Sequence, residues 1–184
     1  MKKDTSIDDN EPCRFPEARQ RLLEMLEKDQ WVRTEADFSQ ASTHQRVNQI
    51  DYDNYQNLRQ ILETIKSPSV DNIGNDGAQA VFLIAQHSAF DIAFMEEVLD
   101  LMQECAETDK DSTYYLGIPY LIDRLKMIKG QEQVYGTQFV QLSNSEHVPY
   151  PIEDEKNVDK RRSQYGLEPL EDYKVTMGLS QGGK

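Results

Sequence analysis

Polar side chains interrupt the apolar stripes of several predicted helices. Each lies three or four residues from apolar members of its stripe, and residues at those spacings share one face of a helix. Burying such groups singly costs free energy, and more for charged groups, so we expect them to meet partners in a shared interior space. These inward-facing residues are Asp29, Asn54, His87 and Arg124.

A histidine beside carboxylates is the residue set of general acid–base catalysis. We expect His87 to transfer protons while Asp91 or Asp29 orients its ring. Arg124 would hold an anionic group, and one of the two aspartates would offset its charge. The same residues could instead form a structural network that fixes helix register. Both hypotheses stay open on the sequence alone.

No metal site is expected. His87 and Asp91 lie four residues apart, a spacing that could ligate a metal on one continuous helix. A site needs a third ligand, and the chain has no HExxH motif and no cysteine–histidine cluster. A helix break at Ser88, with Asp91 as the N-cap of the next helix, is the alternative. We therefore expect neither a metal nor another cofactor.

A predicted strand carries a second polar set. Alternation along a strand places Gln133, Tyr135 and Thr137 on one face. Gln138 lies on the other face, together with Gly136. Amide, phenol and hydroxyl groups suit hydrogen bonding to a neutral or anionic ligand beside Arg124. The alternative is a hairpin that packs through its aromatic residues with its polar groups outward. The residues that would position the ligand are Gln133, Tyr135, Thr137 and Gln138.

Two further features favour structural interpretations. The turn from Gly74 to Gly77 could offer backbone N–H groups to an anion, but it lacks a Walker lysine and does not follow a strand. We interpret it as a helix-entry turn. Arg161 and Arg162 are adjacent on a predicted helix, where neighbours point about 100° apart, so at most one faces a given site. We expect solvated charges there.

Apolar spacing predicts the elements that position these residues. The third helix is apolar nearly all round, which is typical of a helix at the centre of a bundle. The sequence therefore predicts a mainly α fold, an orthogonal or irregular bundle of five to six helices with one small β-hairpin. The expected helices span 15–32, 46–66, 78–87, a segment following Asp91, 119–130 and 154–166, with a last helical turn at 170–173 and hairpin strands at 134–142 and 148–152.

Length and composition indicate one cytoplasmic domain. The chain has 184 residues, and we expect a disordered N-terminal tail over 1–12, a single helical domain over 13–177 and a flexible tail over 178–184. No apolar run approaches the roughly 20 residues that cross a bilayer, and the first residues do not resemble a secretory signal. Two cysteines, Cys13 and Cys105, are expected to be reduced thiols.

The charge balance limits the class of partner. The formal net charge is −13, which repels phosphate backbones, so we expect no nucleic-acid partner. We expect no membrane partner either. A small polar or anionic ligand in a local pocket, or a basic protein surface, remains compatible with the charge.

Short motifs run through the chain from residue 19 to 173. The densest block is Tyr120-Leu121-x-Asp123-Arg124 followed by Gly130-x-x-Gln133-x-Tyr135-Gly136-Thr137-Gln138-Phe139. Others are Asp29-Gln30-x-x-Arg33, Asp53-Asn54, Gln86-His87-x-x-x-Asp91 and Gly166-Leu167-x-Pro169-Leu170. In these motifs the chain resembles a bacterial family of small proteins of unknown function. The resemblance supports the domain limits and implies no reaction.

Two functions follow as expectations. The first is a small intracellular enzyme, or an enzyme-like ligand-binding domain, with a polar His/Arg/Asp pocket and hydrolytic or transfer chemistry. The alternative is an acidic protein-interaction module, an inhibitor or immunity-type partner, in which the polar network is purely structural.

Overall fold

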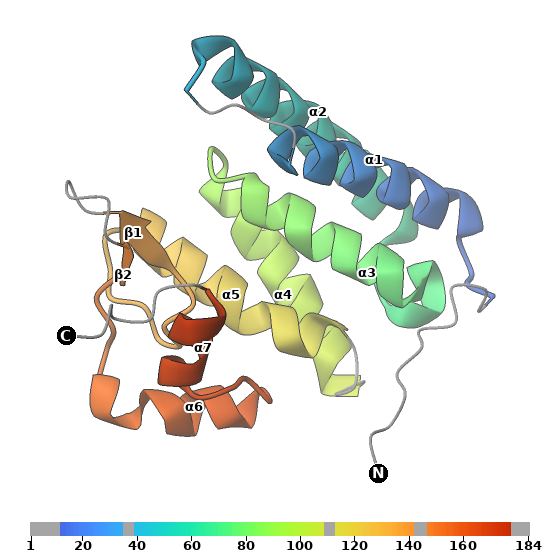
Figure 1. The fold of residues 1–184 in the computed structure, drawn as a ribbon. Coiled ribbons are helices and arrows are strands. Elements are labelled where there is room, and N and C mark those ends of the chain that lie inside the picture. Colours follow the sequence, from blue (N-terminus) through green and yellow to red (C-terminus); the bar gives the residue numbers. More distant parts are fainter. Residues whose placement is uncertain (1–11, 35–38, 109–112, 142–146, 178–184) are drawn as a thin grey trace. The chain divides into compact units, whose positions relative to one another are not determined.

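The chain is mainly α-helical with one small hairpin, as the sequence predicts (Figure 1). The computed structural model describes residues 12–34, 39–108, 113–141 and 147–177. Apart from Pro12, the predicted tails lie outside the described residues. No helix within those ranges is both long and apolar enough to cross a membrane.

The chain divides into two compact units, residues 1–114 and 115–184. The expected single domain over 13–177 stays a prediction. The helices of the first unit are α1 (Pro16–Thr34), α2 (Ala41–Ile65), α3 (Val70–His87) and α4 (Ile92–Thr108), followed by the start of α5 (Thr113–Ile128).

Helix α3 is the centre of the first unit, because it packs against α1, α2 and α4. The apolar composition of its second half predicts this position, and residues such as Ala78, Val81 and Ile84 are buried there. Small alanines let neighbouring helices approach closely, and the larger side chains fill the space between them. α3 therefore holds the helices on which the first polar cluster is built.

The predicted entry turn is a kink inside α3. Gly74 has a φ of 72°, and a Cβ at this position would lie 2.9 Å from Asp76 Oδ1. Arg19 Nε and Nη2 donate to Asp76 Oδ1 and Oδ2 at 2.7 and 2.8 Å, and the Gly77 N–H donates to the same carboxylate at 2.7 Å. The chain's own carboxylate thus satisfies a helix N–H here, which supports the helix-entry interpretation.

The second unit contains the rest of α5 and a series of short elements. These are β1 (Phe139–Gln141), β2 (His147–Pro149), the 3₁₀ helix η1 (Glu155–Asn157), α6 (Val158–Gln164) and α7 (Leu170–Thr176). β1 and β2 pair antiparallel, with Val140 opposite Val148. The predicted hairpin is confirmed.

The hairpin is shorter than predicted, and residues 134–138 are not a strand. A single isolated bridge joins Gln133 to Ile152. The Asp123 carboxylate accepts backbone N–H groups of this segment, so those donors are not available to a neighbouring strand. The expected alternation of polar faces over this segment was therefore wrong.

Three helix starts also differ from the prediction, and the first is that of α2, which begins at Ala41 rather than at residue 46. α5 begins at Thr113 and contains Pro119 in its interior rather than at its first turn. The helix predicted to start at residue 154 begins only at Val158, because Asp154 has a left-handed backbone with a φ of 43° and its side chain makes no capping hydrogen bond. Its carboxylate accepts Asn157 Nδ2 at 2.8 Å instead, and α6 follows after the 3₁₀ turn.

Two glycines of the second unit provide a matched test of packing. Gly136 and Gly130 have φ values of 70° and 69°, so alanine is strained at both. A Cβ on Gly136 would lie 2.9 Å from Leu170 Cδ1 and 3.0 Å from Ile152 Cδ1, whereas a Cβ on Gly130 meets nothing within 4 Å. We expect Gly130→Ala to lower the free energy of unfolding by about 1 kcal/mol and Gly136→Ala by about 3 kcal/mol, measured by urea denaturation. Equal losses would contradict the close approach at Gly136.

Candidate functional site

The first unit brings a histidine from α3 onto a buried aspartate from α1. His87 Nδ1 lies 2.9 Å from Asp29 Oδ1. The Asp29 side chain is 1% exposed, and the His87 side chain is 17% exposed. An ionised carboxylate only accepts hydrogen bonds, so the shared proton belongs to Nδ1 of the imidazole.

The other ring nitrogen of His87 has no hydrogen-bond partner among the described residues. With Nδ1 protonated by its contact to Asp29, the neutral ring carries its lone pair on Nε2. A half-buried imidazole oriented in this way can take a proton from a bound molecule and return it. The pair therefore has the geometry of a carboxylate–histidine general base.

Arg33 and Asp51 complete the cluster. Arg33 Nη2 donates to Asp29 Oδ1 at 3.1 Å and also to Asp51 Oδ1, so one guanidinium joins α1 to α2. Gln30 Nε2 donates to the other Asp29 oxygen at 2.8 Å. Asp29 thus receives hydrogen bonds from three side chains, which is how a buried carboxylate is stabilised.

The electrostatics of the two carboxylates differ. Burial by itself raises the pKa of Asp29, but the hydrogen bond and charge of His87, together with Arg33, lower that pKa below its ordinary value. For Asp51, burial raises the pKa, and the attraction of Arg33 only partly offsets that effect. Asp29 is therefore the anion of the cluster, and Asp51 is the carboxylate that more readily accepts a proton.

Two residues in or next to this cluster in the sequence carry a buried polar atom without a partner. Arg33 Nε and Gln86 Oε1 are both buried, and neither forms a hydrogen bond within the part of the chain that the structure describes. Buried polar groups in native proteins are nearly always satisfied by protein, water or ligand. One of these atoms belongs to a partner of Asp29, and the other to the residue before His87.

Asn54 lies on the same helix interface but not in the cluster's hydrogen-bond network. It is buried, and its Nδ2 donates to the backbone oxygen of Met25 at 3.4 Å. This contact ties α2 to α1. The ligand-binding role expected for Asn54 stays a prediction.

Asp91 does not orient His87. α3 ends at His87 and α4 begins at Ile92, so the two residues are not on one continuous helix. Asp91 Oδ1 accepts the Phe94 N–H at 3.0 Å, which is the predicted N-cap, and Oδ2 accepts the Tyr55 hydroxyl at 2.7 Å. The hydrogen bond from Tyr55 is the main reason that the pKa of Asp91 is lowered.

The second unit is organised around a different buried carboxylate. Asp123 is 0% exposed and accepts the backbone N–H groups of Val134, Tyr135 and Thr137 at 2.7–3.1 Å, as well as the Thr137 hydroxyl. Burial raises the pKa of Asp123, and these hydrogen bonds oppose the rise. The carboxylate folds the 133–138 segment around itself.

The side chains of Gln133 and Gln138 also hold the 133–138 segment together by hydrogen bonds. Gln133 Nε2 donates to the Gln138 and Tyr150 backbone oxygens at 3.0 and 2.7 Å, and its Oε1 accepts the Gln138 N–H at 2.8 Å. Gln138 Nε2 donates to the Thr137 hydroxyl at 3.1 Å. These amides are largely engaged with the chain's own backbone, and their expected role in positioning a ligand stays a prediction.

Arg124 and Tyr135 also belong to this unit. Arg124 Nη1 donates to Gln138 Oε1 at 3.3 Å. The Tyr135 ring is buried against Tyr165 at a centroid distance of 5.3 Å, and burial raises the pKa of its phenol. The expected pairing of Arg124 with Asp29 or Asp91 stays a prediction.

The expectation that Arg161 and Arg162 are solvated was wrong for Arg162, which is 1% exposed. Arg162 Nε and Nη1 donate to the Glu168 and Tyr135 backbone oxygens at 2.6 and 2.7 Å. Backbone carbonyls compensate its burial, although burial still lowers its pKa. Arg161 Nε donates to the Val134 oxygen at 2.8 Å, so both arginines hold the loop around Asp123.

Sequence reasoning missed Asp51 and Asp123. Asp51 lies four residues after Val47 and three before Asn54, both buried on α2. The spacing that identifies the other inward polar residues would have found it. Asp123 lacks such a signal, because its burial depends on a loop that returns 11 to 14 residues later in the chain.

Asp51 also supplies the third ligand that a metal site requires. Ligand atoms of Asp29, Asp51 and His87 all lie within 4.8 Å of one another. Oxygen and imidazole ligands of this kind suit zinc and similar divalent ions. Arg33, however, donates to the oxygens of both carboxylates and brings the positive charge that a metal would bring. The side chains as they stand fit an ion-pair network better than a metal centre.

This competition between Arg33 and a metal is testable. We expect Arg33→Gln to lower the free energy of unfolding by about 2 kcal/mol, because it leaves two carboxylates facing each other. We also expect zinc to raise the melting temperature of Arg33→Gln by about 4 °C or more and that of the wild-type protein by less than about 1 °C. Arg46→Gln, which removes an arginine elsewhere in the unit, is the control. Equal zinc stabilisation of the wild-type protein and Arg33→Gln would show that the guanidinium does not exclude a metal.

The lowered pKa of Asp29 predicts a pH dependence of stability. A carboxyl whose folded-state pKa lies below its unfolded value of 3.8 stabilises the fold above that value, and the contribution disappears as the pH falls through the folded-state pKa. We expect the difference in unfolding free energy between the wild-type protein and Asp29→Asn to be constant above about pH 5 and to shrink towards about pH 2. Urea titrations at several pH values measure it. A difference that grows on acidification would contradict the assignment of Asp29 as the anion.

Comparison with known proteins places the chain in a family but not in a functional class. None of the curated proteins matches the chain, and neither does any solved structure. One family model matches residues 16–183, which include almost all of both units. The chain therefore belongs to the family of unknown function DUF6624.

Proposed function

We propose that this protein is a ligand-binding domain with acid–base activity, in which His87 transfers protons to and from a small polar molecule. The observation that carries the proposal is the contact of His87 Nδ1 with the buried Asp29 carboxylate, which leaves Nε2 without a partner among the described residues. A structural histidine that is fully satisfied would have both ring nitrogens engaged.

Asp29 orients the imidazole of His87. The carboxylate fixes the tautomer and stabilises the imidazolium that forms when Nε2 takes a proton. Its lowered pKa keeps it ionised at the pH at which the reaction would run. Gln30 and Arg33 hold the carboxylate in place from the same helix, so the pair is preorganised before a ligand arrives.

The surroundings of the pair favour a polar ligand. Arg33 Nε is a buried donor and Gln86 Oε1 is a buried acceptor. Neither atom has a hydrogen-bond partner within the described ranges. Buried donors and acceptors of this kind are nearly always satisfied by water or by a bound polar molecule. A hydrolytic or transfer reaction, in which Nε2 activates water or a hydroxyl group, is the chemistry that this residue set supports.

A substrate screen with a matched pair of histidine variants tests the proposal. The purified protein would be assayed against chromogenic p-nitrophenyl esters, phosphates and glycosides. We expect His87→Gln to lower any turnover by about 100-fold or more, which is within the usual contribution of a general base. His147→Gln, at an exposed histidine of β2, should keep the activity of the wild-type protein.

Stability separates catalysis from structure in this experiment. We expect His87→Gln to unfold cooperatively with a free energy within about 1 kcal/mol of the wild-type value, because one neutral hydrogen-bonding group replaces another. Full activity in His87→Gln would contradict the proposal. Loss of folding in His87→Gln would show that the contact with Asp29 is structural.

An acidic protein-interaction module is the second candidate, and the formal net charge of −13 favours it. We place either function in the cytoplasm as part of the proposal. An interaction module predicts co-purification with a basic protein that weakens steeply between 0.1 and 0.5 M salt, roughly as screening of exposed charges requires. It also predicts that His87→Gln leaves this partner's affinity unchanged.

A further inference from the structure

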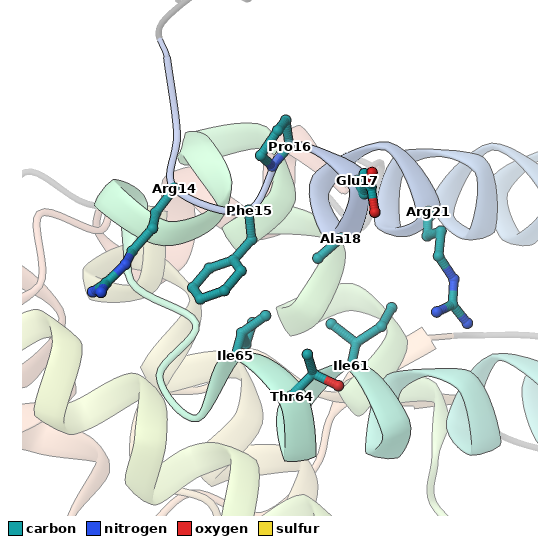
Figure 2. A pocket seen from close by; sticks show the side chains of 9 residues that line it. All are labelled: Arg14, Phe15, Pro16, Glu17, Ala18, Arg21, Ile61, Thr64 and Ile65. Carbon is teal, nitrogen blue, oxygen red and sulfur yellow. The ribbon is translucent and has the colours of Figure 1, made fainter.

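A cavity of about 330 Å³ lies between the beginning of α1 and the end of α2 (Figure 2). Its inner surface is apolar, with the Phe15 ring and Ala18 on one side and Ile61 and Ile65 on the other. The two isoleucines are almost fully buried in the core. The volume is at the lower end of the range of about 300–1,000 Å³ that is typical of small-molecule pockets.

Two arginines stand at opposite ends of this apolar surface. Arg14 and Arg21 both line the cavity, and Figure 2 shows them on either side of the row of apolar residues. Arg21 Nη2 donates to Asn57 Oδ1 at 3.0 Å, which leaves its other N–H donors for a further partner. Neither arginine forms an ion pair with a residue that the structure describes.

The wall that carries Arg14 is held in place by backbone hydrogen bonds. The N–H groups of Arg14 and Phe15 donate to the backbone oxygens of Asp71 and Asn72 at 2.9 and 2.8 Å. The Arg14 guanidinium also lies over the Phe15 ring, 5.8 Å from its centroid. The segment is therefore fixed before a ligand binds, which lowers the entropy cost of binding.

The charges around the cavity select the sign of the ligand. In a chain with a formal net charge of −13, a cavity lined by two arginines and one carboxylate, that of the exposed Glu17, is locally cationic. Guanidinium groups bind carboxylates with paired hydrogen bonds, and apolar surface is stabilised when an apolar ligand covers it.

We propose that this cavity binds an amphipathic carboxylate, a molecule with an apolar chain or ring and an acidic end. The apolar body lies against Phe15 and the isoleucines, and the carboxylate pairs with Arg14 or Arg21. The site is independent of His87 and of the function proposed for it, since none of its lining residues belongs to the Asp29 cluster.

Decanoate and decanol form a matched pair of probes for the full-length protein, because they differ only in the acidic group. Isothermal titration calorimetry should show saturable binding of decanoate at one site, and binding of decanol that is weaker by about tenfold or more. The double variant Arg14→Gln/Arg21→Gln should bring the affinity for decanoate down to that of decanol. Arg46 does not line the cavity and stacks on the Trp31 ring. The control variant Arg46→Gln should therefore bind decanoate as the wild-type protein does.

A variant that fills the cavity distinguishes this site from other apolar surfaces. Ala18→Phe places a ring between the helices and should abolish binding of both probes, provided that circular dichroism shows an intact helical fold. Glu17→Gln removes the opposing charge and should strengthen decanoate binding about twofold. The proposal is overturned if decanoate shows no saturable binding at 1 mM or less, if decanol binds as well as decanoate, or if a folded Ala18→Phe variant keeps its affinity.

Discussion

The buried negative charge of Asp29 constrains how the helices of the first unit pack. Asp29 is almost completely removed from water, and an isolated carboxylate in that position would cost several kcal/mol. Hydrogen bonds from Gln30, Arg33 and His87 compensate that cost. Because these donors come from α1 and α3, and Arg33 also reaches Asp51 on α2, three helices must adopt one arrangement for the charge to be tolerated. The orientation of the largely buried His87 imidazole follows from this arrangement.

In the second unit, a buried carboxylate, that of Asp123, likewise fixes the conformation of a loop. Asp123 gathers backbone N–H groups of residues 134–137, and Arg161 and Arg162 hold the carbonyls on the other side of that segment. An irregular loop can be buried in this way because charged side chains take the place of strand partners. The polar residues of the 133–138 segment therefore have a structural task that is sufficient to explain their burial.

Local periodicity could predict most of the helices, the hairpin and the inward direction of Asp29 and His87, because these depend on spacing along one element. It could not predict which partners meet. Asp91 matched the spacing of a ring-orienting carboxylate, but the break after His87 turned it into a helix cap. The burial of Arg162 and the role of Asp123 depend on contacts between residues that are distant in the chain, and such contacts leave no periodic signal.

In the proposed function, Asp29 fixes the tautomer of His87 and leaves Nε2 as the base. The ¹⁵N chemical shifts of the His87 ring, measured at alkaline pH where the imidazole is neutral, report which ring nitrogen carries the proton. We expect a protonated Nδ1 and an unprotonated Nε2 in the wild-type protein, with that preference lost in Asp29→Asn. A wild-type ring protonated on Nε2 would contradict this expectation.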